Sequence, residues 1–126
     1  MRYLAFLAIA TFFSISVLVS THREWFEFIY NDLPGGDKSA HFLGPGLLAF
    51  FMVLGLSSRD AQHQLPSPNA SLAAVALLVT LDEVIQLAIP SRAFELKDLA
   101  WSLTGVLVFG LAAAGIKWVG RLRDPK

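Results

Sequence analysis

An apolar segment of membrane length that contains ionisable residues is the feature that most restricts how this chain can fold. The apolar run begins near Leu72 and includes Asp82, Glu83 and Gln86 before it ends at Pro90. A charged side chain in hydrocarbon is costly, so such residues face a protein interior or a wet cavity and usually mark a functional site. The rest of the chain must therefore provide a packed environment for this segment.

The composition places the chain among membrane proteins. Of its 126 residues, 55% are hydrophobic and only 16% are charged, and the mean hydropathy is +0.57. A soluble domain carries about 25% charged residues. The absence of cysteine excludes disulfides, zinc–thiolate sites and iron–sulfur clusters. The net charge of zero argues against a nucleic-acid partner, which would require a basic face.

The apolar runs predict an all-α integral membrane bundle of four transmembrane helices in a single domain. A spanning helix requires about 20 mostly apolar residues. The predicted spans cover residues 3–20, 40–56, 72–89 and 99–119. The first run could instead be a cleaved signal peptide, but Leu18-Val19-Ser20 is a poor small-x-small cleavage site. We therefore expect a retained helix.

The connecting segments carry distinct patterns. Residues 21–36 mix Trp25 and Phe28 with acidic residues, so they are expected to form either a short helix lying on the membrane or an ordinary surface loop. Pro45 lies between two glycines, which favours a bend in the second span or the close approach of a neighbouring helix. Residues 57–71 are polar and punctuated by proline, and are expected to form a soluble loop.

The positive-inside rule predicts a chain in the cytoplasmic membrane with both termini in the cytoplasm. This orientation places on the inner side Arg2, Arg59, Lys117, Arg121, Arg123 and Lys126. The outer side then holds Arg23, Lys38, Arg92 and Lys97.

Four spans bring three separated motifs to the outer membrane face. The second span starts there, the third ends there and the fourth starts there. At about 100° per residue, each triplet of polar residues on the second and third spans occupies one arc about 100° wide. Three residues of the fourth span also share one helix face, because they are spaced i, i+4, i+7. The three sets are Asp37, Lys38 and His41; Asp82, Glu83 and Gln86; and Asp98, Ser102 and Gly105.

Charge pairing within this cluster is expected but not fixed by the sequence. Arg92 is the preferred counter-ion because its planar guanidinium can bind a carboxylate through two hydrogen bonds. We expect Arg92 to pair with Glu83 or Asp98, and Lys38 to pair with Asp82. Because Asp82 and Glu83 diverge by about 100° on a helix, one should pair while the other faces a cavity. A purely structural interpretation also remains, since Asp37 and Asp98 suit helix N-termini.

These motifs resemble those of the VanZ-like family of small multi-pass membrane proteins, which is named after a teicoplanin-resistance protein. The resemblance covers residues 37 to about 110 and rests on Asp37-Lys38-x-x-His41-Phe42, Asp82-Glu83-x-x-Gln86, Arg92, and Asp98 with Gly105 seven residues on. The family usually has asparagine four residues after the last aspartate, where this chain has Ser102. A role that needs both faces of an amide is therefore not expected here.

We interpret the cluster as a binding site for a polar or amphipathic ligand at the outer membrane face. The resemblance implies a cell-envelope role, such as glycopeptide resistance of the teicoplanin type or the handling of a lipid-linked envelope component. In this interpretation Lys38 and Arg92 hold an anionic headgroup. The expected site residues are Asp37, Lys38, His41, Asp82, Glu83, Gln86, Arg92, Asp98 and Ser102.

Two other functions remain open. The chain could be an intramembrane hydrolase or transferase for a lipid-linked substrate, with Glu83 or Asp82 as the base and His41 as the acid. It could also be a structural partner in a membrane complex, with membrane lipids as its immediate neighbours. No cofactor is expected, and no metal site, because besides His41 only His22 and His63 could supply imidazoles.

Overall fold

The computed structural model describes residues 2–32, 34–56, 68–89 and 95–124, and this part of the chain is helical with short turns. No strand occurs in these ranges, so the predicted all-α fold is confirmed. The elements in chain order are α1 (Arg2–Thr21), η1 (Arg23–Phe26), α2 (Glu27–Asn31), α3 (Asp37–Leu56), α4 (Pro68–Gln86) and α5 (Leu96–Arg123).

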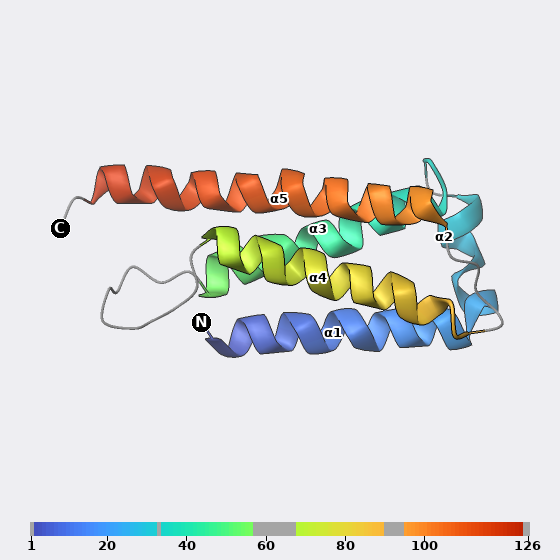
Figure 1. Ribbon diagram of the computed structural model, residues 1–126. Coiled ribbons are helices and arrows are strands. Elements are labelled where there is room, and N and C mark those ends of the chain that lie inside the picture. Colours follow the sequence, from blue (N-terminus) through green and yellow to red (C-terminus); the bar gives the residue numbers. More distant parts are fainter. Residues whose placement is uncertain (1, 33, 57–67, 90–94, 125–126) are drawn as a thin grey trace.

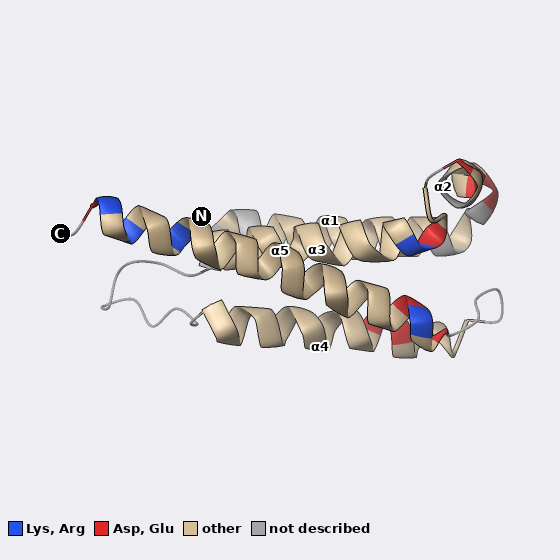
Figure 2. Cartoon of the chain, turned by 90° about the horizontal axis from the view of Figure 1, so that it is seen from above, with Lys and Arg blue, Asp and Glu red and all other residues tan. Residues whose placement is uncertain are grey.

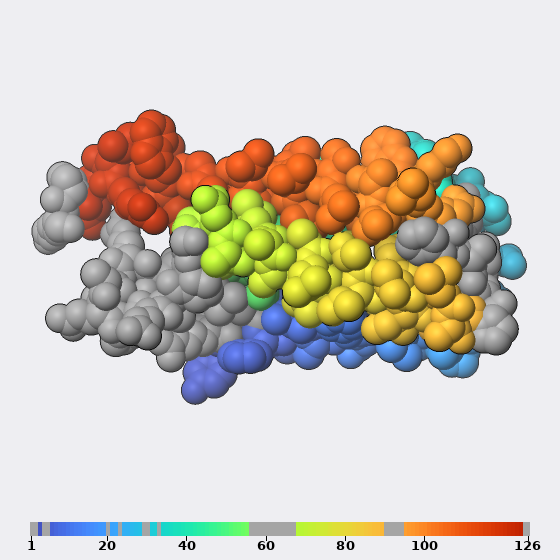
Figure 3. Space-filling model, viewed as in Figure 1, coloured from blue at the N-terminus to red at the C-terminus, as the bar shows by residue number. Residues whose placement is uncertain are grey.

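The four long helices lie alongside one another, and α3 is the central one (Figure 1). In the space-filling view from the same side, α1, α4 and α5 lie in front and little of α3 is visible (Figure 3). Helix α3 contacts α1, α4 and α5, and α4 also contacts α5. The described N-terminal and C-terminal ends lie on the same side of the bundle, while α2 runs across the opposite end (Figure 1). The start of α3, the end of α4 and the start of α5 therefore meet at the α2 end.

Three helices are long and apolar enough to cross a membrane, namely α3 over Asp37–Gly55, α4 and α5. Helix α1 contributes a shorter apolar stretch, Phe6–Val19, within the described residues. Large apolar side chains such as Leu77, Leu107 and Leu111 are exposed on the outside of the bundle. This outward apolar surface suits contact with lipid, because hydrocarbon does not penalise it.

Both ends of α4 differ from the predicted span for local reasons. Helix α4 begins at Pro68, four residues before the predicted start, because proline is tolerated in the first turn, where its missing N–H is not needed. The same helix ends at Gln86, and residues 87–89 continue as tight turns. Their N–H groups donate to the carbonyls three residues back, at 3.0–3.1 Å. The remainder of the predicted loop, residues 57–67, lies outside the described ranges.

The segment between the first two long helices forms two short helical pieces, η1 and α2, which cross the end of the bundle. Trp25 and Phe28 are exposed on this segment, and Trp25 stacks on His22 with ring centroids 4.1 Å apart. Of the two expected structures for this segment, a short helix or an ordinary loop, the structure therefore has the helical one. Gly35 and Gly36 follow with φ angles of 82° and 60°, a conformation that glycine adopts without steric cost.

The closest helix contact joins α3 to α5 and depends on glycine. A Cβ at Gly105 would overlap the backbone carbonyl of Phe42, and a Cβ at Gly46 would lie 3.1 Å from the Gly105 oxygen. Pro45 lies inside a continuous α3, and Gly46 beside it serves the close approach of a neighbouring helix, one of the two expected outcomes. A small core of Leu48, Ala49, Met52, Val75, Val79 and Val106 lies next to this contact.

Candidate functional site

Eight of the nine expected site residues lie in described parts of the chain, and they gather at the α2 end of the bundle. Figure 2 shows that the acidic residues concentrate at this end, whereas basic residues mark the last turns of α5. Helix α3 contributes its first turns, α4 its last turns and α5 its first turns. The ninth residue, Arg92, lies outside the described residues, so its expected pairing with Glu83 or Asp98 stays a prediction.

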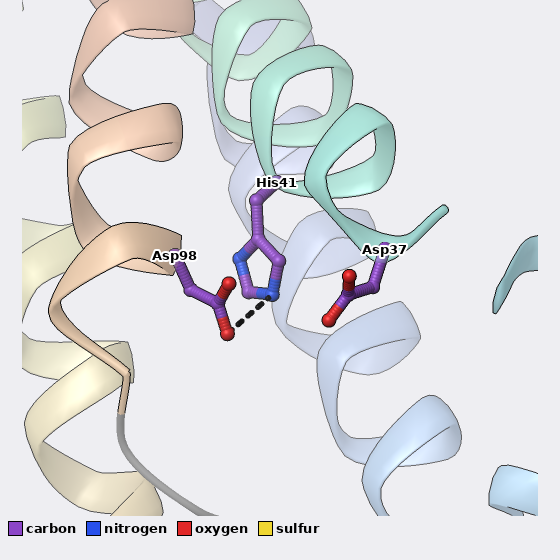
Figure 4. A group of neighbouring side chains, drawn as sticks. All are labelled: Asp37, His41 and Asp98. Carbon is purple, nitrogen blue, oxygen red and sulfur yellow. Dashed lines mark ion pairs between the residues drawn. The ribbon is translucent and has the colours of Figure 1, made fainter. Parts of the chain in front are cut away.

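His41 connects α3 to both neighbouring helices. Its Nδ1 lies 3.3 Å from Glu83 Oε1 on α4 and 3.3 Å from Ser102 Oγ on α5. Its Nε2 lies 3.6 Å from Asp98 Oδ2, the contact drawn in Figure 4. Glu83 is only 2% exposed and Asp98 only 7%. Both nitrogens of one imidazole are therefore held between carboxylates that are shielded from water.

Lys38 pairs with α5 rather than with the expected Asp82. Its Nζ forms ion pairs with Asp98 Oδ1 and, at 3.0 Å, with Glu95 Oε2, and it lies 3.9 Å from Asp37 Oδ1. The reason is the rotation of α3, which packs most closely on α5 and turns Lys38 toward the start of that helix. Glu95 was not among the expected site residues. Its position just before the fourth apolar run could have indicated that it lies at the same end of the bundle.

Asp82 faces the first helix instead. The Ser16 hydroxyl donates to the Asp82 carboxylate, 3.0 Å from Oδ1 and 3.1 Å from Oδ2. Asp82 and Glu83 thus diverge as their spacing predicts, with Glu83 directed to His41 and Asp82 directed to α1. Ser16 is a residue that the sequence did not single out, because a lone hydroxyl in an uncharged apolar run carries little signal.

A groove of about 660 Å³ lies between α1, α3 and α4 and begins at this cluster. One end is polar and is lined by Asp37, His41, Asp82, Gln86 and Ser102. The walls are mostly apolar, with Thr11 as an exception, and include Leu7, Phe12, Ile15, Leu43, Leu48 and Phe51. From Asp37 to Phe51 the α3 wall is about 21 Å long at 1.5 Å per residue. The groove is therefore long, narrow and amphipathic along its length.

Lys38 does not line this groove. It lines a separate hollow of about 380 Å³ together with Phe42, Trp101 and the Pro34-Gly35 turn. Because its ammonium is already paired with Asp98 of α5 and with Glu95 just before that helix, its expected role as an anionic-headgroup clamp has no support from this arrangement. The polar end of the groove presents carboxylate, imidazole, amide and hydroxyl groups instead.

The helices and their outward apolar faces define a multi-pass membrane protein with an acidic, histidine-centred cluster at one end of an apolar groove. The chain belongs to the VanZ/LLP1 family, whose family model matches residues 2–117. Comparison with curated proteins gives no match, and comparison with solved structures gives none either.

Proposed function

We propose that this protein binds a lipid-linked component of the cell envelope in the groove between α1, α3 and α4. The observation that carries the proposal is the polarity of the groove, which is mostly apolar along its walls and has its charged residues only at the α2 end. Its length of about 21 Å is more than half of the roughly 30 Å hydrocarbon core of a bilayer. A prenyl or acyl chain would occupy the walls while its headgroup lies at the polar end.

The polar end favours a headgroup rich in hydrogen-bond donors. The carboxylates of Asp37 and Asp82 accept hydrogen bonds, and the Gln86 amide both donates and accepts. Hydroxyl and amine groups of a sugar or peptide headgroup match this set. A lipoglycopeptide has the same combination of an acyl chain with sugar and peptide groups, so this site would also serve a role in glycopeptide resistance of the teicoplanin type.

The proposed location is the cytoplasmic membrane, with the polar end of the groove at the outer face and both termini in the cytoplasm. Lys117, Arg121 and Arg123 lie in the last turns of α5, at the end of the bundle opposite the acidic cluster. Basic residues favour the cytoplasmic side of a membrane protein, and this supports the orientation.

Mass spectrometry of lipids that copurify with the protein in mild detergent tests the proposal. Gly44 lines the groove, and a Cβ there would meet only Phe12 Cε2, at 3.9 Å. The variant Gly44→Leu should therefore fill the groove without a backbone clash. Gly115→Leu is the matched control, because a Cβ at Gly115 meets nothing within 4 Å.

We expect one class of prenyl- or acyl-linked envelope component to be enriched with the wild-type protein and with Gly115→Leu, and to be lost with Gly44→Leu. Identical lipid profiles from all three folded proteins would contradict the proposal.

A further inference from the structure

We propose that, contrary to the expectation from the number of histidines, Asp37, His41 and Asp98 form a binding site for a divalent transition-metal cation such as Zn²⁺. One ligand atom from each of the three side chains lies within 4.8 Å of the others. Figure 4 shows the two carboxylates on either side of the His41 ring, near the edge that carries Nε2. One imidazole nitrogen with two carboxylate oxygens is a donor set that suits first-row transition metals.

The separation between two of the ligand atoms already fits tetrahedral coordination. With metal–ligand bonds of about 2.0–2.2 Å, neighbouring ligand atoms in a tetrahedral site lie about 3.3–3.6 Å apart. His41 Nε2 and Asp98 Oδ2 are separated by 3.6 Å. Asp37 completes the set from the first turn of α3, where its side chain is 36% exposed and has room to turn toward the other two.

The remaining nitrogen of His41 is held in the way that metal-binding histidines require. Nδ1 lies 3.3 Å from Glu83 Oε1, on a helix that supplies none of the three ligands. With its proton on Nδ1, the ring donates to Glu83, or to the Ser102 hydroxyl at the same distance, and keeps the lone pair of Nε2 for the cation. Metal-binding histidines almost always donate their other N–H to such a partner, which fixes the ring orientation.

This tautomer creates a local conflict that a cation relieves. A lone pair on Nε2 would face the carboxylate oxygens of Asp98 and Asp37, which are also electron-rich. Lys38 occupies Asp98 Oδ1 and leaves Oδ2 facing the imidazole. A divalent cation between the three ligand atoms would replace these repulsive contacts with coordination bonds. Without a cation, a proton on Nε2 relieves them, with the Ser102 hydroxyl donating to Nδ1.

The position of the site also connects it to the groove. Asp37 and His41 line the groove, so the remaining coordination position of a tetrahedral cation would open toward it. There the cation would accept an oxygen of the headgroup, phosphate included. This last consequence depends on the proposed function, whereas the cation site itself does not.

Calorimetric titration of the purified, untagged protein in detergent with Zn²⁺ tests the site. We expect one Zn²⁺ per chain, with affinity lowered at least tenfold in Asp37→Asn and in His41→Gln. The controls are His22→Gln and Asp32→Asn, which change an imidazole and an exposed acid outside the cluster. Both should bind Zn²⁺ like the wild-type protein.

Glu83→Gln distinguishes this site from adventitious binding of Zn²⁺ at the surface, which would not depend on a buried residue. Loss of an outer hydrogen-bond partner lowers metal affinity about 10–100-fold, and we expect that decrease with the stoichiometry unchanged. If His41→Gln fails to fold, Asp37→Asn decides, since Asp37 lies at the exposed start of its helix. No bound Zn²⁺, or undiminished binding in Asp37→Asn, would overturn the proposal. Because no lipid enters this titration, its failure would leave the copurification result untouched.

Discussion

His41 is the residue on which the polar cluster is centred. Its imidazole lies within 3.6 Å of groups from both α4 and α5, including two carboxylates that are almost fully shielded from water. Removing one partner of such a buried contact leaves the other uncompensated. Substitutions of His41 are therefore expected to change both the stability of the fold and the function. Substitutions at the margin of the cluster allow stability and function to be measured separately.

Ser16 offers such a substitution. Its hydroxyl bonds both oxygens of Asp82 and so links α1 to α4. Interhelical hydrogen bonds in membrane proteins contribute about 0.6 kcal/mol on average and up to about 1.7 kcal/mol. We expect Ser16→Ala to lower the free energy of unfolding by about 1 kcal/mol, measured by reversible denaturation in detergent micelles.

Ser14→Ala provides the matched control, because Ser14 is exposed on the same helix. Its free energy of unfolding should equal that of the wild-type protein. An equal loss of stability in the two variants would show that the Ser16–Asp82 hydrogen bond does not hold α1 in place.

The contact between α3 and α5 depends on the absence of a side chain at Gly105. A Cβ there would overlap the Phe42 carbonyl, and backbone cannot move aside as a flexible side chain can. Overpacking in well-packed interiors costs about 1–3 kcal/mol. We expect Gly105→Ala to lose at least that much stability in thermal unfolding, and to disturb the nearby Ser102 and Asp98.

Gly115→Ala tests the same substitution on the same helix with no neighbour to displace. Its thermal stability should be unchanged or slightly higher, since alanine favours the helix by up to about 1 kcal/mol over glycine. If both variants lose the same stability, the close contact at Gly105 is not the cause.

The helices could be predicted from the sequence more fully than the contacts between them. Apolar runs separated by turn residues located α3, α4 and α5, and the angular spacing of Asp82 and Glu83 predicted their divergence. The partner of Lys38 could not be predicted, because it depends on how α3 is rotated against α5. The Ser16–Asp82 hydrogen bond could not be predicted from the sequence either. Ser14 and Ser16 occupy the same apolar run, and only the packing of the helices distinguishes them.

At the scale of the whole molecule, the orientation in the membrane decides which compartment the polar cluster faces. The chain has no cysteine, so a single introduced thiol reports its own position. Lys97→Cys near the start of α5 should react with a membrane-impermeant maleimide added to intact cells. Arg123→Cys at the other end of α5 should react only after the membrane is permeabilised. Both residues are exposed in the structure. The reverse pattern of labelling would place the cluster at the cytoplasmic face.

The central claim is that an amphipathic ligand lies in the groove with its headgroup at the polar end. Photo-crosslinking with a glycolipid that has a sugar headgroup and carries a diazirine at the far end of its chain tests this most directly. The groove extends away from the polar cluster to Leu7 on α1 and Phe51 on α3. Peptide mapping should therefore find the probe attached near these residues, with attachment suppressed by excess unlabelled lipid. Attachment spread over outward-facing positions such as Leu77 and Leu107, without suppression, would contradict the claim.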